Sequence, residues 1–250
     1  MCGIAGALIF DSENFNLDYL WSVISKCNNR GKESFGVSAW NENSGWIDYR
    51  SFDISPENCK KHFENYHLKG LSLYLHTSRA EPTTEWKAEK SELDIPPFRN
   101  DLFAVAHNGI ISNDHELTDQ YHLNRKSPID TSIIPDLLSK TGTVETLNAL
   151  RGGLSLGIID SNKQSLTLCR NFMPLAISWI PGMIVFASEM NYFDEYNLPF
   201  SAWHFWEFPH YTILELHRDY YKGPYEWSIN TDFSKEVPTR SYPTVLKNGK

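Results

Sequence analysis

A chain of 250 residues with 41% hydrophobic and 22% charged side chains can bury a sizeable core, and its composition excludes disordered, collagen-like and coiled-coil classes. A net charge of -8 gives no basic footprint for a nucleic-acid backbone, and the longest apolar stretches are too short or too interrupted to cross a bilayer. We therefore expect one domain without direct nucleic-acid or membrane contact.

The predicted elements, taken in chain order, are mostly strands. Short β-branched and aromatic runs bounded by Gly, Pro, Asn or Asp predict strands. These runs lie at residues 2–10, 36–40, 71–76, 102–108, 157–160, 165–170, 176–180 and 183–188. Apolar spacing and capping residues predict helices at residues 17–28, at 131–140 behind the capping residue Asp130, at 143–150, and a turn after Asn113. We predict an α+β fold with two sheets.

Residues 217–250 form a predicted C-terminal extension rich in tyrosine and proline, with no clean period of either kind. Aromatic side chains in such a segment pack over the domain or over a partner more often than they bind a small ligand. We expect the folded domain to cover residues 2–216.

The four cysteines indicate a reducing, cytoplasmic compartment. No two of them form a Cys-x-x-Cys pair, and the histidines lack metal-ligand spacing, so neither a zinc site nor a disulfide scaffold is indicated. We interpret Cys27, Cys59 and Cys169 as core or surface residues.

Cys2 has a special position because it directly follows the initiator methionine. Aminopeptidases remove Met before small residues, and Cys2 would then own a free α-amino group. That amine has a pKa of about 7.7 to 8.0 and could accept the thiol proton, so one residue would supply nucleophile and base. Position alone favours an ordinary buried cysteine, which is common in a first strand.

Seven short motifs change that balance, because together they resemble the glutaminase domain of class II glutamine amidotransferases. These are the N-terminal nucleophile hydrolases of glucosamine-6-phosphate synthase and glutamine phosphoribosylpyrophosphate amidotransferase. The resemblance covers about residues 2–216. The motifs are Cys-Gly-Ile-x-Gly at 2–6, Arg-Gly-x-x-Ser-x-Gly at 30–36, His-Asn-Gly at 107–109, Asp-Thr at 130–131, a Leu-x-Gly strand entry at 150–156, Arg-Asn-x-x-Pro-Leu at 170–175 and Phe-Ala-Ser-Glu at 186–189.

The resemblance implies a fold and a role for each matching residue. The fold is a four-layer αββα sandwich. Cys2 would attack the side-chain amide of L-glutamine, and the Asn108 side chain and the Gly109 backbone N–H would form the oxyanion hole. Arg79 would bind the substrate α-carboxylate and Asp130 its α-ammonium. No metal or organic cofactor is implied.

Two of these residues have competing interpretations. The family usually has His-x-Arg followed by an aromatic residue, whereas this chain has His76-Thr77-Ser78-Arg79, so the arginine is shifted by one position. Arg79 could instead be a surface residue paired with Glu81. Asp130 could be a plain helix N-cap, and both roles could hold together. Arg30 is interpreted as a structural anchor near Cys2, and His107 as a packed strand-end residue.

The resemblance also implies a partner, because family members usually carry a second domain that consumes ammonia. We expect the ammonia to pass to a separate synthase, with the aromatic extension as a candidate docking surface. Two alternatives remain open at this point. One is another N-terminal nucleophile amide hydrolase, and the other is a catalytically silent glutamine-binding module that regulates a partner.

Overall fold

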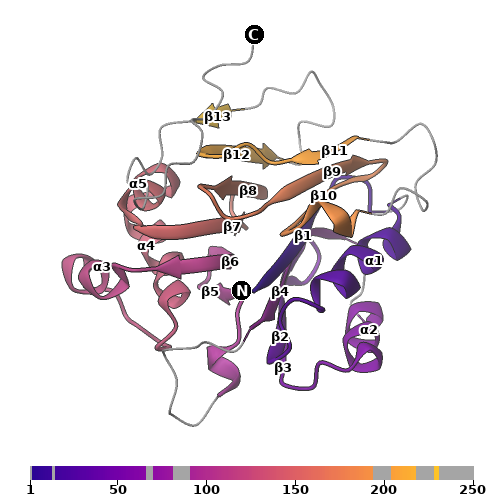
Figure 1. Cartoon of the computed structure of the whole chain (residues 1–250), viewed down its shortest axis with the longest axis horizontal. Coiled ribbons are helices and arrows are strands. Elements are labelled where there is room, and N and C mark those ends of the chain that lie inside the picture. Colours follow the sequence, from indigo (N-terminus) through magenta and orange to yellow (C-terminus); the bar gives the residue numbers. More distant parts are fainter. Residues whose placement is uncertain are drawn as a thin grey trace.

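The computed structural model describes residues 2–12, 15–65, 70–80, 91–193, 204–217 and 228–230 (Figure 1). Two antiparallel sheets form its centre, and helices lie on both sides of the pair. No helix in these residues is both long enough and apolar enough to cross a membrane.

The first sheet has seven strands in the order β11-β9-β10-β1-β4-β2-β3. Its strands are β1 (Gly3–Ile9), β2 (Ser34–Asn41), β3 (Gly45–Ser51), β4 (Leu71–Arg79), β9 (Ala176–Ile180), β10 (Met183–Ala187) and β11 (His204–Glu207). β1 lies at the centre and pairs with β4 on one side and with β10 on the other. The first strand of the chain is therefore protected on both edges.

The second sheet has six strands in the order β13-β12-β8-β7-β6-β5. Its strands are β5 (Phe98–Arg99), β6 (Phe103–Ile111), β7 (Gly152–Asp160), β8 (Ser165–Arg170), β12 (Thr212–His217) and β13 (Ser228–Asn230). β13 belongs to the predicted extension and pairs with β12. The other residues of that extension, apart from His217, lie outside the described residues.

The helices lie on the outer faces of the two sheets, with α1 and α2 on one side and α3, α4 and α5 on the other (Figure 1). They are α1 (Leu17–Cys27), α2 (Pro56–Asn65), α3 (Asp114–Tyr121), α4 (Ile134–Thr141) and α5 (Thr143–Ala149), with short 3₁₀ turns η1 (Glu92–Asp94), η2 (Asp130–Ile133) and η3 (Met190–Tyr192).

Strand alternation assigns the apolar side chains to three cores. On β1, Ala5 and Ala7 pack towards α1, whereas Ile4 and Leu8 pack towards the second sheet. A third core joins the second sheet to α3, α4 and α5. Because side chains alternate between the two faces of a strand, three cores between four layers give an αββα sandwich. The predicted fold class is confirmed.

One predicted helix differs from the structure. The sequence predicts a single helix over residues 131–140 capped by Asp130, but the structure has the turn η2 followed by α4. Pro135 lies in the first turn of α4. A backbone N–H in that turn has no partner within the helix, so the N–H that proline lacks costs no helical hydrogen bond. Ile129, not Asp130, occupies the N-cap position of η2, so the N-cap interpretation of Asp130 is wrong.

Candidate active site

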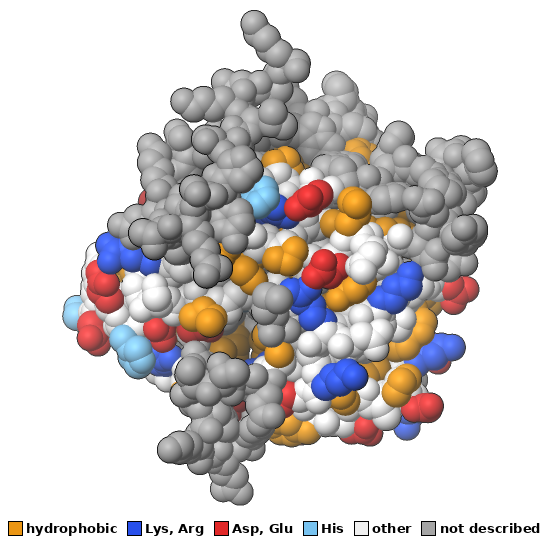
Figure 2. All heavy atoms as spheres, in the orientation of Figure 1, with side chains coloured by type: hydrophobic (Ala, Val, Ile, Leu, Met, Phe, Trp, Pro, Cys, Tyr) orange, Lys and Arg blue, Asp and Glu red, His pale blue; other side chains and the backbone are white. Residues whose placement is uncertain are grey.

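Cys2 directly precedes β1 and belongs to the face of that strand that looks towards the second sheet. Alternate residues of a strand point to the same face, and Ile4 and Leu8, which are on the same face as Cys2, both lie in the core between the sheets. In Figure 1 the N-terminal end of β1 lies in the middle of the view. The same view in Figure 2 shows Lys, Arg, Asp, Glu and hydrophobic side chains mixed, so no single charge sign covers this face.

Arg79 lies opposite Cys2. Gly3 pairs with Ser78 in the antiparallel register of β1 and β4, so the next pair outward joins Cys2 to Arg79. Arg79 is on the same face of β4 as Leu73 and Leu75, whose side chains lie between the sheets. Directly opposed residues on one face have their Cβ atoms about 4.5–5.5 Å apart. The one-position shift of the arginine therefore brings it to the thiol.

Asn108 faces the same space from the second sheet. Ala104 and Ala106, which are on the same face of β6 as Asn108, pack in the core between the sheets. Asn108 is fully buried, and neither its amide nitrogen nor its amide oxygen has a hydrogen-bond partner among the described residues. A buried carboxamide without partners is destabilising by about 1–3 kcal/mol. The Asn108 amide can therefore donate a hydrogen bond to a bound group.

Gly109 has a backbone that only glycine adopts easily. Its φ is 149°, and a Cβ added there would lie 1.8 Å from the carbonyl oxygen of Gly153. That carbonyl also lies 3.2 Å from Nε2 of His107. The strand end that carries Asn108 and Gly109 is thus held tightly against β7.

Three hydroxyl groups surround the same space. Ser34, Thr77 and Ser155 are buried, and their hydroxyl groups have no hydrogen-bond partner among the described residues. Ser155 pairs directly with Asn108, and Ser34 pairs directly with Arg79. Because buried polar groups are almost always paired, these hydroxyls are candidate hydrogen-bond partners for a bound polar group.

The electrostatics of the thiol combine opposing effects. Burial raises the pKa of Cys2, whereas a hydrogen bond from the Ala80 backbone and the charge of Arg79 lower it, and the charge of Asp130 raises it again. A thiol with a raised pKa is protonated at neutral pH, so it needs a base to become a nucleophile.

Asp130 links η2 to the end of β6. Its Oδ2 accepts a hydrogen bond from the Ile111 backbone at 2.6 Å, and its Oδ1 accepts from the backbone and hydroxyl of Thr131 at 2.6 and 2.9 Å. Thr131 Oγ1 also lies 2.8 Å from His107 Nδ1. The predicted packed histidine is therefore a buried link between β6 and η2, and burial lowers its pKa.

Arg79 is not a surface residue. Its guanidinium lies 3.2 Å from Glu33, and the two side chains are only 5% and 6% exposed. The expected alternative partner, Glu81, lies outside the described residues. Arg30 forms an ion pair with Glu189, which ties the 30–36 segment to the strand end after β10, as its predicted role as an anchor requires.

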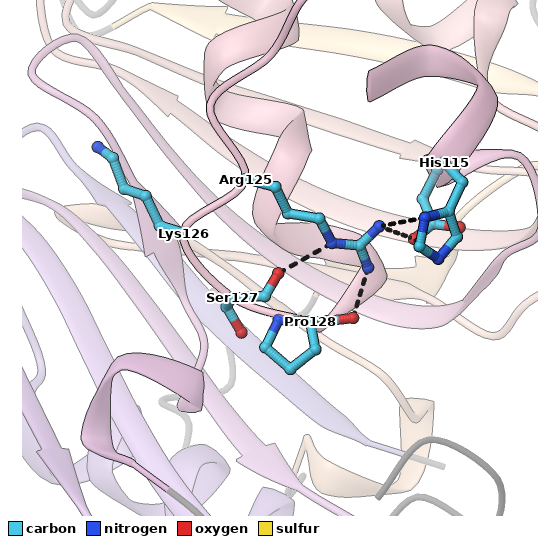
Figure 3. Close-up of a pocket in the computed structure, with 6 residues that line it drawn as sticks. His115, Arg125, Lys126, Ser127 and Pro128 are labelled. Atoms are coloured by element: carbon cyan, nitrogen blue, oxygen red, sulfur yellow. Dashed lines mark hydrogen bonds and ion pairs between the residues drawn. The ribbon is translucent and has the colours of Figure 1, made fainter. Parts of the chain in front are cut away.

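A separate open cavity of about 690 Å³ adjoins the loop before Asp130 (Figure 3). It is lined by Asp114, His115, Arg125, Lys126, Ser127 and Pro128. The Arg125 guanidinium donates to the carbonyls of Ser127 and Pro128 at 3.0 and 2.5 Å and pairs with Asp114 at 2.6 Å (Figure 3). These contacts are internal, so Arg125 shapes the loop that leads to Asp130.

Strand alternation thus places Cys2, Arg79 and Asn108 on faces that look into the space between the sheets. Gly109 follows Asn108 on β6, and Asp130 is hydrogen-bonded to the end of the same strand. Sequence reasoning missed Glu33, whose signal was a charged residue inside the Arg30–Gly36 motif. It also missed the three unpaired hydroxyls. The three other cysteines are buried, which settles the choice between core and surface for them.

Comparisons with known proteins identify the family of this chain. Residues 85–195 match the family model of the glutamine amidotransferase domain. The chain is 35% identical over 205 residues to a 7-cyano-7-deazaguanine synthase of Saccharolobus solfataricus, covering 78% of this chain and 44% of that protein. It is 28% identical over 205 residues to a glutamine--fructose-6-phosphate aminotransferase of Bradyrhizobium diazoefficiens, covering 76% and 32%. The chain belongs to the class II glutamine amidotransferases.

Solved structures show the same fold as this amidotransferase domain. An allosteric regulatory enzyme of purine biosynthesis superposes with a TM-score of 0.68 at 19% identity, covering 94% of this chain and 50% of that one. The glutamine phosphoribosylpyrophosphate amidotransferase of B. subtilis gives a TM-score of 0.64 at 17% identity, with the same coverage. The amidotransferase domain therefore spans half or less of the length of these relatives.

Proposed function

We propose that this chain hydrolyses L-glutamine to L-glutamate and ammonia through a thioester on Cys2. The observation that carries the proposal is the fully buried Asn108 carboxamide, which has no hydrogen-bond partner among the described residues. Asn108 and Cys2 both face the space between the two sheets. Homologous domains of this family are enzymes that hydrolyse glutamine. A purely binding module would not need a nucleophile that faces the same space as such a donor.

The proposed reaction starts with removal of Met1, which frees the α-amine of Cys2. The amine takes the thiol proton, directly or through a water, and the sulfur attacks the side-chain amide carbon of glutamine. The oxygen that becomes negative is held by the Asn108 side chain and the Gly109 N–H. The carbon–nitrogen bond breaks, the nitrogen takes the proton from the Cys2 ammonium, and ammonia leaves. Water then attacks the thioester, giving glutamate and restoring the thiol.

Two charged residues would select free glutamine. The Arg79 guanidinium can bind the α-carboxylate through two parallel hydrogen bonds, a geometry that lysine cannot reproduce. Asp130 would attract the α-ammonium while its oxygens also hold Ile111 and Thr131. A carboxylate oxygen accepts more than one hydrogen bond, so these structural contacts and the substrate contact are compatible.

The ammonia would pass to a separate acceptor protein. The curated relatives are more than twice as long as the segment this chain matches, and some are named 7-cyano-7-deazaguanine synthases. A protein that supplies the remaining synthase portion is therefore the first partner to test. Residues 217–250 remain the candidate docking segment beyond the domain at residues 2–216, and a cytoplasmic location remains a prediction.

The experiment measures glutamate release by the purified chain, alone and with a candidate synthase subunit. We expect glutamine to be the preferred substrate in a panel of amides, and the synthase to stimulate turnover. Preference for another amide would favour a different amide hydrolase, and no hydrolysis under either condition would favour a silent binding module. Full turnover without any partner would contradict the proposed ammonia transfer.

A further inference from the structure

We propose that Glu33 is a positioning residue that fixes the guanidinium of Arg79 beside Cys2, so that Arg79 can receive the α-carboxylate of glutamine. The inference rests on the proposed glutaminase function and deepens it. Glu33 itself would not touch the reacting atoms. It would act through Arg79 and set the affinity for substrate.

The first support is the contact itself. Arg79 Nη1 lies 3.2 Å from Glu33 Oε2, and both side chains are almost completely buried. A buried cation without a counter-ion is strongly unfavourable, and removing one partner of a buried pair leaves the other uncompensated. Glu33 therefore holds the arginine in place while no substrate carboxylate is present.

The second support is the backbone, which fixes both ends of the pair. The Glu33 N–H donates to the Arg79 carbonyl oxygen at 3.0 Å, and the next residue, Ser34, pairs with Arg79 in the sheet. A Cβ added at Gly31 would lie 2.2 Å from the Ser78 carbonyl oxygen. The turn before β2 therefore packs directly on the peptide that carries Arg79, and Glu33 cannot drift away from it.

The third support is where this pair lies. Arg79 is the residue opposite Cys2 across β1 and β4, and its charge lowers the pKa of the thiol. An arginine side chain has many rotamers, and only some present its planar face of donors to a bound carboxylate. The Glu33 carboxylate, fixed on one side of the guanidinium, favours some of these rotamers over others. Substrate binding would then order fewer groups, which favours affinity.

The test uses the full chain with Glu33→Gln and Glu33→Asp, and measures kcat and KM for glutamine together with thermal unfolding. We expect Glu33→Gln to raise KM tenfold or more with a smaller change in kcat, and Glu33→Asp to restore part of the affinity. A control elsewhere in the chain is Glu207→Gln, which removes the charge of a largely exposed carboxylate 3.0 Å from Arg170 and should leave KM unchanged. An unchanged KM in folded Glu33→Gln would overturn the inference.

A double-mutant cycle separates positioning from general damage. In an Arg79→Met background, Glu33→Gln should have no further effect on KM, because Glu33 acts only through the arginine. The double variant also lacks both charges, so it keeps the buried site neutral if Glu33→Gln alone does not fold. Equal effects of Glu33→Gln with and without Arg79 would contradict the inference. A wild-type chain that does not hydrolyse glutamine would instead contradict the proposed function.

Discussion

Cys2 and Arg79 face each other across the antiparallel pair of β1 and β4, one position beyond the pair formed by Gly3 and Ser78. This register places the shifted arginine on the same side of the sheet as the proposed nucleophile. Along a strand, a shift by one residue moves a side chain to the other face. In this chain the face that Arg79 occupies is the one that looks towards Asn108.

The oxyanion-hole role of Asn108 is tested by Asn108→Ala. We expect kcat to fall by about 100- to 1,000-fold, because one donor to the developing negative charge is lost. The free energy of unfolding should rise or stay constant, because the buried carboxamide has no partner among the described residues. Steady-state kinetics and chemical denaturation measure the two effects. A less active variant that is also strongly destabilised would indicate a structural role.

Thr77 provides a test of the unpaired hydroxyls. Thr77→Val keeps the shape of a side chain that is fully buried and removes a hydroxyl without a partner among the described residues. We expect the free energy of unfolding to increase by about 1–3 kcal/mol and kcat/KM for glutamine to decrease.

The matched control for this substitution is Thr146→Val. Thr146 is also fully buried, but its hydroxyl lies 2.8 Å from the hydroxyl of Thr141. Its removal should decrease the free energy of unfolding by about 1 kcal/mol. If both valine variants were destabilised equally, the Thr77 hydroxyl would have a structural partner and no role in the site.

His76 predicts how stability depends on pH. Burial lowers the pKa of His76 to about 3, and its Nε2 lies 2.7 Å from Asn28 Oδ1. Below pH 6.5 the unfolded chain binds a proton at this residue and the folded chain does not, so stability falls as the pH is lowered from 6.5 towards 3. At pH 5 the loss is about 2 kcal/mol.

Thermal unfolding at pH 7 and pH 5 measures this effect. We expect the melting temperature of the wild type to be lower at pH 5, and His76→Gln to show a smaller difference between the two pH values. His107, whose pKa burial also lowers, should retain its own share of the dependence in that variant. Identical pH dependence in the two proteins would show that His76 is protonated in the folded state.

The sequence was sufficient for the centre of the fold, and it supplied the candidate residues of the proposed site. The strands with clear apolar runs, such as β1, β6 and β8, were predicted close to their observed ends. β3 was missed because all seven of its residues are only partly buried, so no apolar pattern marks it. α2 was missed because, among its residues whose burial the structure describes, only Cys59 and Phe63 are buried, so its apolar pattern is weak.

Contacts between distant segments could not be predicted. Glu33 and Arg79 are far apart in sequence, and only the pairing of β2 with β4 brings them together. The same holds for the hydrogen bond that the Ile111 N–H donates to Asp130 and for the hydrogen bond between Thr131 and His107. Motifs identify candidate site residues, whereas tertiary packing decides which other residues hold them in place.

The most direct test of the central claim treats the purified chain with a glutamine-like diazo ketone and maps the modified site by mass spectrometry. We expect a mature chain that lacks Met1 and carries one covalent adduct on Cys2, with loss of glutaminase activity in proportion to labelling. Cys2→Ala should remain folded, unlabelled and inactive. An adduct on another residue, or normal glutaminase activity in Cys2→Ala or in a chain that retains Met1, would contradict the mechanism.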